Sequence, residues 1–132
     1  IIKKEIPIYD VVVAYIENGN KFIITKRPTD KMLGGLWELP GGKREKGEKL
    51  EQALKREIKE ELDISIGVRK KIGKIKHTYS HMKIRLHGFK CKIKKGNLKH
   101  KQSDDLKWIN FNEIKQYAFP KANHKLFSIL QK

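Results

Sequence analysis

The chain contains little cysteine, and it has no long run of apolar residues. Cys91 is the one cysteine among 132 residues, so an internal disulfide and a four-cysteine iron–sulfur cluster are both excluded. No apolar stretch approaches the roughly 20 residues that a membrane-spanning helix needs, and no secretory signal is visible. We therefore expect a cytoplasmic protein without a membrane partner, in which Cys91 packs as a small apolar residue.

The chain has fewer acidic residues than basic ones. It contains 15 Asp and Glu and 31 Lys and Arg, which gives a net charge of +16. Such an excess of positive charge is typical of proteins that bind anions, nucleic acids among them. However, 26 of the basic residues are lysine, whereas arginine is the residue favoured for bidentate contacts to phosphates and bases. The composition favours an anionic small-molecule ligand and leaves nucleic-acid binding open.

The length of the chain predicts a single domain over residues 1–132 that buries roughly two-thirds of its unfolded surface. Because the chain begins with Ile1 and not with Met, we expect it to be trimmed or cut from a longer polypeptide. Its oligomeric state, monomer or dimer, is left open.

Apolar runs and turn signals predict strands on both sides of one long helix. Two β-branched runs flank Asn18-Gly19-Asn20 and predict a hairpin. Pro40-Gly41-Gly42 predicts a sharp turn at which the backbone approaches a ligand closely. The predicted strands are residues 9–16, 21–25, 37–39, 64–79, 82–93 and 106–110, and the predicted helices are 48–62, 112–117 and 123–131. This order favours a mixed sheet between helices.

The long helix carries acidic residues on the margin of its apolar face. Seven of the 15 acidic residues lie between Glu45 and Asp63. At roughly 100° per residue, Glu57 and Glu61 project inside the apolar stripe and Glu60 just beyond its edge. Such carboxylates are costly to desolvate unless they are paired or bind a metal, and Mg²⁺ is commonly held by carboxylates, phosphates and water. The helix is therefore either a cation site or an amphipathic surface helix with lysine partners.

The ordered pattern over residues 42–64 resembles the signature of the Nudix hydrolases. It consists of Gly42, Glu48 and the run Arg56-Glu57-Ile58-x-Glu60-Glu61-x-x-Ile64, which meet eight of the nine positions that the signature defines. Asp63 stands where the family has glycine, and Asp tolerates the left-handed conformation that this position requires. The resemblance implies an α/β/α sandwich with a central mixed β-sheet. It also implies hydrolysis of a nucleoside diphosphate linked to a further group, with Mg²⁺ or Mn²⁺ as cofactor.

The resemblance further implies roles for individual residues. Glu57 and Glu61 would be the main metal ligands, with Glu60 binding directly or through water and the Gly41 carbonyl as a backbone ligand. Glu57 could instead act as the general base. Arg56 would orient a carboxylate, and Glu48 would support the loop or the metal site.

Other candidates lie outside the signature. A further carboxylate could come from Asp104 or Asp105, near Gln102, although a solvated loop is the alternative for this segment. Arg27 and Lys43 flank the glycine turn and could hold substrate phosphates. For Lys43 the alternative is an ordinary surface lysine.

Three segments resemble the MutT group, which cleaves oxidised purine nucleotides such as 8-oxo-dGTP to the monophosphate and pyrophosphate. They are residues 26–28, 33–43 and 118–123. Asn123 falls where that group places the asparagine that reads the purine edge, which an amide can do because it both donates and accepts. Its alternative is an N-cap of the last helix. Trp37 or Phe119 could stack on the base or belong to the core.

Residues 77–84 (HTYSHMKI) resemble a loop of the Nudix-like carboxy-terminal domain of MutY adenine glycosylases, which recognises 8-oxoguanine in DNA. By that resemblance the Ser and His of this loop, Ser80 and His81, lie near the damaged base, and Tyr79 and Ser80 are candidate substrate-binding residues. DNA becomes a partner if the chain is part of an adenine glycosylase. Typical domains of that kind have lost the catalytic glutamates, which are present here. The sequence therefore favours the nucleotide hydrolase and keeps the lesion-recognition domain as the alternative.

Overall fold

The structure is a computed structural model that describes residues 6–131. Its strands are β1 (Ile8–Asn18), β2 (Lys21–Lys26), β3 (Trp37–Glu38), β4 (Gly41–Lys43), β5 (Ser65–Thr78), β6 (Lys83–Lys95) and β7 (Asp105–Asn110). Its helices are α1 (Leu50–Leu62), the 3₁₀ helix η1 (Phe111–Gln116) and α2 (Lys121–Leu130).

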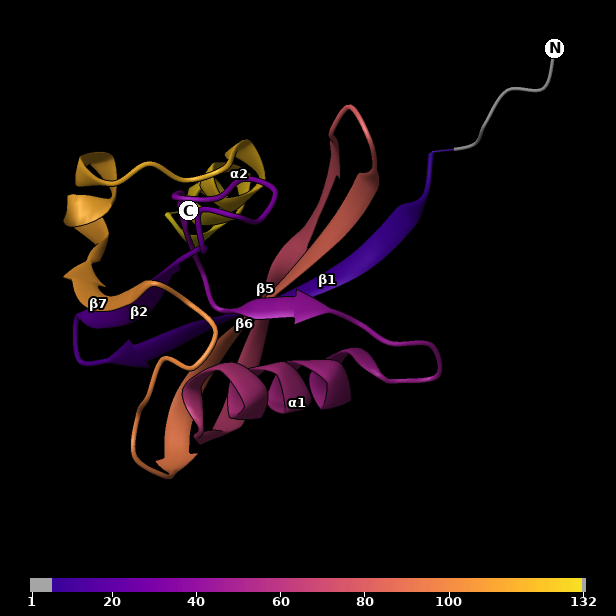
Figure 1. Ribbon diagram of the computed structural model, residues 1–132. Helices are drawn as coiled ribbons and strands as arrows, with labels where there is room; N and C mark the ends of the chain where they lie inside the picture. The colour runs from indigo at the N-terminus through magenta and orange to yellow at the C-terminus, as the bar shows by residue number, and fades with distance from the viewer. Residues whose placement is uncertain (1–5, 132) are drawn as a thin grey trace, which may run out of the picture.

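A mixed seven-stranded sheet forms the centre of the fold, with α1 and α2 on opposite sides of it (Figure 1). The main path runs β3-β2-β1-β6-β5, and β4 and β7 pair with β1 and β2. The β1–β6 pair is parallel, and the other five strand pairs within residues 6–131 are antiparallel. The predicted α/β/α sandwich with a central mixed β-sheet is confirmed.

Alternate residues of β1 supply the two layers of the core, as the two-residue period of a strand requires. Val12 and Ile16 pack in the layer that contains α1, whereas Val13 and Tyr15 pack in the layer that contains α2. Along the apolar stripe of α1, Ala53, Leu54, Ile58 and Leu62 are fully buried in the first layer, and Leu50 packs against it partly buried. This packing confirms the helical period expected for this segment.

Of the segment predicted as a sharp turn, Pro40 is a bend, but Gly41 and Gly42 lie in a strand. Gly41–Lys43 forms β4 and pairs with Val11–Val13 of β1. A Cβ atom on Gly41, whose φ is 154°, would collide with the carbonyl oxygen of Val12. Glycine is needed here because two backbones approach closely, not because the chain reverses.

The ends of α1 differ in how well the sequence predicted them. The helix begins at Leu50, with Lys49 as its N-cap, so Glu48 lies in the preceding loop and not in the helix. Asp63 caps the other end in the left-handed conformation, with φ 59° and ψ 32°, and its N–H donates to the Lys59 carbonyl at 3.0 Å. The expectation that Asp63 replaces the usual glycine in this conformation is confirmed.

Two further expectations about helices are corrected. The segment predicted as a short helix near residues 112–117 is the 3₁₀ helix η1. The final helix begins at Lys121 with Pro120 as its N-cap, so the N-cap interpretation of Asn123 is wrong. None of the helices within residues 6–131 is long and apolar enough to cross a membrane.

The left-handed conformation of Asp63 makes a testable prediction about stability. We expect Asp63→Val to unfold at a lower urea concentration than Asp63→Gly, by a free energy of at least about 1 kcal/mol, because a β-branched residue is strained at this φ. Both variants lack the carboxylate that lies near Lys59 and Lys101, so their difference isolates the backbone term. Equal midpoints for the two variants would contradict the assigned conformation.

Candidate active site

Three consecutive residues of β4 contact three side chains of α1. The Gly41 N–H donates to Oε2 of Glu61 at 3.2 Å. A Cβ atom on Gly42 would collide with the carboxylate of Glu57. The Lys43 carbonyl accepts from Nη2 of Arg56 at 3.1 Å. The signature residues of the helix are thus held against the glycine strand.

Arg56 is the centre of a network of ion pairs. Its Nε and Nη2 donate to the two carboxylate oxygens of Glu48, each at 2.8 Å. Its Nη1 donates to Oε1 of Glu57 at 2.9 Å and lies 3.3 Å from Oε2 of the exposed Glu60. This geometry is what the expected orienting role of Arg56 requires, and it shows that Glu48 fixes the guanidinium from the loop.

The carboxyl groups near β4 are crowded and poorly solvated. Glu61 is only 6% exposed, and burial, reinforced by the neighbouring charges of Glu38 and Glu57, raises its pKa to about 8. Burial also raises the pKa of Glu38 to about 7, against the opposing effect of Arg27, and it raises the pKa of Glu57. By contrast, hydrogen bonds from Arg56 lower the pKa of Glu48 to about 2. Among the described residues, no cationic group lowers the pKa of Glu61, whereas Arg56 neutralises Glu48.

The crowded carboxyl groups fit a divalent cation. Within residues 6–131 no three His, Cys, Asp or Glu side chains already form a metal-binding cluster. Glu57 and Glu61 both lie against β4. Glu57 is paired with Arg56 at 2.9 Å, whereas burial and the neighbouring carboxylates raise the pKa of Glu61 with no described cationic group opposing them. Hard oxygen donors of this kind suit Mg²⁺ and Mn²⁺. These two residues, with Glu60 nearby, are the ones that could hold the cation.

Two pockets meet at Arg27 and Glu38. One is lined by Gly41, Glu61, Gln102 and Ser103, among others, and the second by Gly42, Lys43, Tyr79, Met82 and Asn123, among others. Nη1 of Arg27 lies 3.3 Å from Oε1 of Glu38. This ion pair lies at the boundary between the pocket that contains Glu61 and the pocket that contains Asn123. The arrangement could hold a charged group beside Glu61 and a planar group beside Asn123.

Glu38 is the site residue that sequence reasoning missed. It lies in β3 between Trp37 and Leu39, both of which are buried, yet its carboxylate reaches both pockets. A charged residue between two apolar core residues, directly before the Pro-Gly-Gly segment, is the signal that could have identified it.

Asn123 and Tyr79, the two candidates for contact with the base, both line the second pocket. Asn123 is 6% exposed, and its Oδ1 accepts from the Leu39 N–H at 3.1 Å. None of the described residues accepts a hydrogen bond from its Nδ2. Burial raises the pKa of Tyr79, so its phenol stays protonated at neutral pH.

Several other candidates lie away from these pockets. Ser80 is exposed at the tip of the β5–β6 hairpin, and Asp104 and Asp105 line neither pocket, although Gln102 does. Trp37 and Phe119 are buried in the α2 layer, which confirms the core interpretation.

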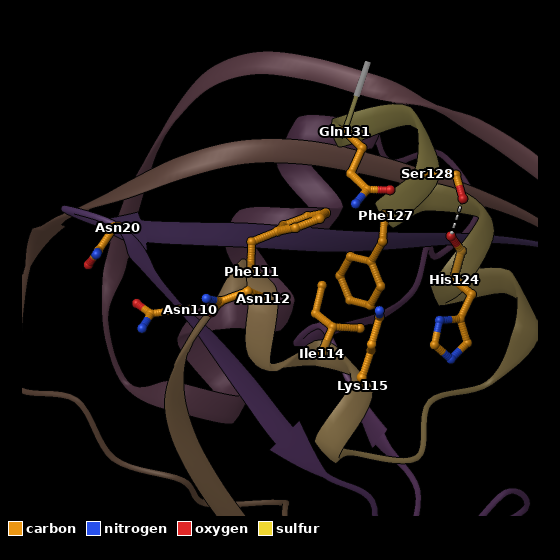
Figure 2. Close-up of a pocket in the computed structure, with 10 residues that line it drawn as sticks. All are labelled: Asn20, Asn110, Phe111, Asn112, Ile114, Lys115, His124, Phe127, Ser128 and Gln131. Carbon is orange, nitrogen blue, oxygen red and sulfur yellow. Dashed lines mark hydrogen bonds between the residues drawn. The ribbon is translucent and has the colours of Figure 1, made fainter.

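A larger hollow lies between η1, α2 and the β1–β2 turn (Figure 2). It is rich in amide side chains, including Asn20, Asn110, Asn112 and Gln131, over an aromatic floor of Phe111 and Phe127. None of the candidate catalytic or substrate-binding residues lines it, so size alone does not identify the site.

Comparison with known proteins identifies the family. The model of the NUDIX domain matches residues 11–128, which is most of the chain. The chain belongs to the Nudix family. The Nudix signature therefore corresponds to the residues that β4 and α1 bring together, and Nudix hydrolases as a group use a divalent cation.

Individual relatives of this Nudix hydrolase cover nearly its whole length. It is 36% identical over 123 residues to an 8-oxo-dGTP diphosphatase of Buchnera aphidicola, covering 93% of each chain. It is 34% identical over 114 residues to a CTP pyrophosphohydrolase of Escherichia coli, covering 86% of this chain and 84% of the relative. The solution structure of the E. coli ORF135 protein superposes with a TM-score of 0.81 at 31% identity, covering 96% of this chain and 90% of that one.

The raised pKa of Glu61 predicts how stability depends on pH without metal. Between the ordinary value of 4.5 and about 8, the folded protein holds a proton on Glu61 that the unfolded chain has lost. The free energy of unfolding should therefore fall as pH rises through this window, by at most about 1.4 kcal/mol per pH unit from this group. Urea titrations in EDTA measure the slope.

Glu61→Gln is the matched control, because the amide keeps the shape of the protonated acid but does not titrate. Its stability should fall less steeply over the same pH range, and Mg²⁺ should stabilise it less at about pH 8 than it stabilises the wild type. Identical pH profiles for the two proteins would show that Glu61 has no raised pKa.

Proposed function

We propose that this protein hydrolyses nucleoside triphosphates, including oxidised purine nucleotides such as 8-oxo-dGTP, to the monophosphate and pyrophosphate with Mg²⁺ or Mn²⁺. The observation that carries the proposal is the packing of Glu57 and Glu61 against β4 beside a pocket lined by Asn123. The relatives named 8-oxo-dGTP diphosphatase and CTP pyrophosphohydrolase support the substrate class.

In this mechanism the chain mainly positions and neutralises charge, as phosphoryl transfer demands. A bound divalent cation would neutralise the phosphates and polarise a phosphoryl oxygen. Glu57, Glu60 and Glu61, with the Gly41 carbonyl, are its proposed ligands, and Glu57 is an alternative base for the attacking water. Arg56 keeps Glu57 in place while Glu48 keeps Arg56 in place.

The substrate would lie across both pockets. Arg27 and Lys43 would contact the phosphates, which is supported by their lining of the pockets beside β4. Tyr79 and Asn123 would contact the base at the other end. Ser80, at the exposed hairpin tip, would meet only a ligand larger than a free nucleotide.

Glu57→Gln and Glu61→Gln test the catalytic assignment. Each change removes one negative charge but preserves side-chain shape, so we expect turnover to fall by several orders of magnitude while the fold stays intact. Pyrophosphate release is measured with Mg²⁺ on 8-oxo-dGTP, dGTP and CTP, and circular dichroism checks the fold. Full activity in either folded variant would refute the assignment.

The same panel separates the enzyme from the lesion-recognition alternative. If the wild type turns over none of the nucleotides but binds 8-oxoguanine duplex tightly, the domain recognises a damaged base and does not hydrolyse nucleotides. The preferred base follows from the ranking of kcat/KM. We also propose a cytoplasmic location, consistent with the free thiol of Cys91.

Asn123→Asp tests base recognition. The aspartate keeps an oxygen that accepts from the Leu39 N–H but loses the two Nδ2 protons that could meet the base. We expect the kcat/KM ratio of 8-oxo-dGTP to CTP to fall by about 10- to 100-fold, as loss of one buried hydrogen bond implies. Asn123→Ala, which also loses the Leu39 contact, should in addition lower the melting temperature. An unchanged ratio in the aspartate variant would exclude Asn123 from base reading.

A further inference from the structure

The positive charge of the chain is concentrated in one segment. Residues 64–103 contain 13 of the 31 Lys and Arg residues and none of the 15 Asp and Glu residues. The other 92 residues contain 18 basic and 15 acidic residues, so almost the whole net charge of +16 belongs to this segment. A lysine-rich composition alone would not remove every acidic residue from a third of the chain.

This segment forms the β5–β6 hairpin and the loop that leads to β7, and the hairpin projects past both helices beside the start of β1 (Figure 1). Ten of its basic side chains make no ion pair with any described carboxylate. They are Arg69, Lys70, Lys71, Lys74, Lys76, Lys83, Lys90, Lys92, Lys94 and Lys95. Lysines on an exposed edge strand prevent unwanted strand pairing, which could explain β5. However, β6 lies between β1 and β5, so its charge needs another explanation.

The hairpin borders a groove at the amino-terminal end of α1, which we name the basic groove. Its charged lining residues are Arg44, Lys49, Lys74, Arg85, Asp10 and Glu48. Lys74 pairs across the sheet with His87, which also lines the groove, and Lys76 pairs with Arg85. The groove is therefore continuous with the basic residues of the hairpin.

Both acidic residues of the basic groove are already neutralised. Asp10 accepts from Nε and Nη2 of Arg85 at 2.8 and 3.0 Å and from Nη2 of Arg44 at 3.2 Å. The hydrogen bonds from Arg85 hold the pKa of Asp10 well below its usual range, so it stays ionised and keeps the two guanidinium groups at the groove. Glu48 is bound through both oxygens by Arg56. A ligand in the groove would therefore meet a surplus of positive charge.

We propose that the basic groove and the adjoining β5–β6 hairpin bind the phosphodiester backbone of a nucleic acid. Residues two apart on a strand lie about 7 Å apart, so Lys74 and Lys76 present a row of charges that matches a linear polyanion better than a single phosphate. Since the contacts are cationic side chains without a base-reading set, binding is independent of sequence and strongly dependent on salt. The surface excludes Glu57, Glu60 and Glu61, so it extends beyond the proposed hydrolase activity.

The test compares two variants that lose the same charge. Lys74→Gln/Lys76→Gln neutralises the proposed surface, and Lys21→Gln/Lys115→Gln neutralises two exposed lysines outside residues 64–103. Fluorescence anisotropy measures binding of a labelled mixed-sequence oligonucleotide, as duplex and as single strand, over a series of NaCl concentrations. The wild type should show a linear fall of log K with log salt, and the hairpin variant should lose about 10-fold or more in affinity and up to about two units of slope.

The control variant should keep the wild-type slope, and both variants should keep nucleotide turnover, because neither changes a site residue. The proposal fails if the wild type binds neither oligonucleotide at low salt. It also fails if the control loses as much affinity as the hairpin variant, since binding would then follow net charge alone. Loss of turnover in the folded hairpin variant would likewise refute a surface separate from the active site. Turnover by the wild type is measured independently, so failure of the hydrolase proposal is recognised separately.

Discussion

Strand β4 can lie against both β1 and α1 only because glycine stands at two successive positions. A Cβ at Gly41 would strike the Val12 carbonyl, and a Cβ at Gly42 would strike the Glu57 carboxylate. This double contact places the carboxylates of α1 beside backbone groups and away from water. Their raised pKa values follow from that desolvation, and so does their suitability for a cation. The site is thus a consequence of how closely three backbone segments approach.

Charges of opposite sign are separated within the molecule. The inner face of α1 lacks counter-charge around Glu61, whereas Arg56 satisfies Glu48 and Glu57 at the other end of the network. The β5–β6 hairpin carries the opposite excess, with no acidic residue in its sequence. An anionic substrate that binds together with a metal cation suits the inner face of α1. A polyanion without a bound metal cation suits the β5–β6 hairpin.

Some of this could be predicted from local pattern. The helical period placed Glu57 and Glu61 inside the apolar stripe and Glu60 just beyond its edge, and their exposures agree, because side-chain direction on a helix follows from residue spacing. Asp63 in the left-handed conformation was predictable because it stands where the family has glycine and because Asp tolerates that conformation. In contrast, Gly41-Gly42 was misread as part of a turn, since glycine permits both a reversal and a close approach and only the neighbouring strand distinguishes them.

The amino-acid order alone was sufficient for the family signature and for the helix that carries the carboxylates, because each depends on residues near one another in the chain. The α/β/α architecture followed from the order of the elements and the family resemblance, since its strand pairs join distant segments. The place of Glu38 in both pockets, the position of Asn123 inside α2 and the exclusion of Asp104 and Asp105 from the pockets depended on the packed fold. So did the pKa values, because desolvation depends on which distant segments cover a carboxyl group. Residue spacing along the chain determines which face of an element a side chain lies on. Burial by distant segments determines its pKa and whether it lines a pocket.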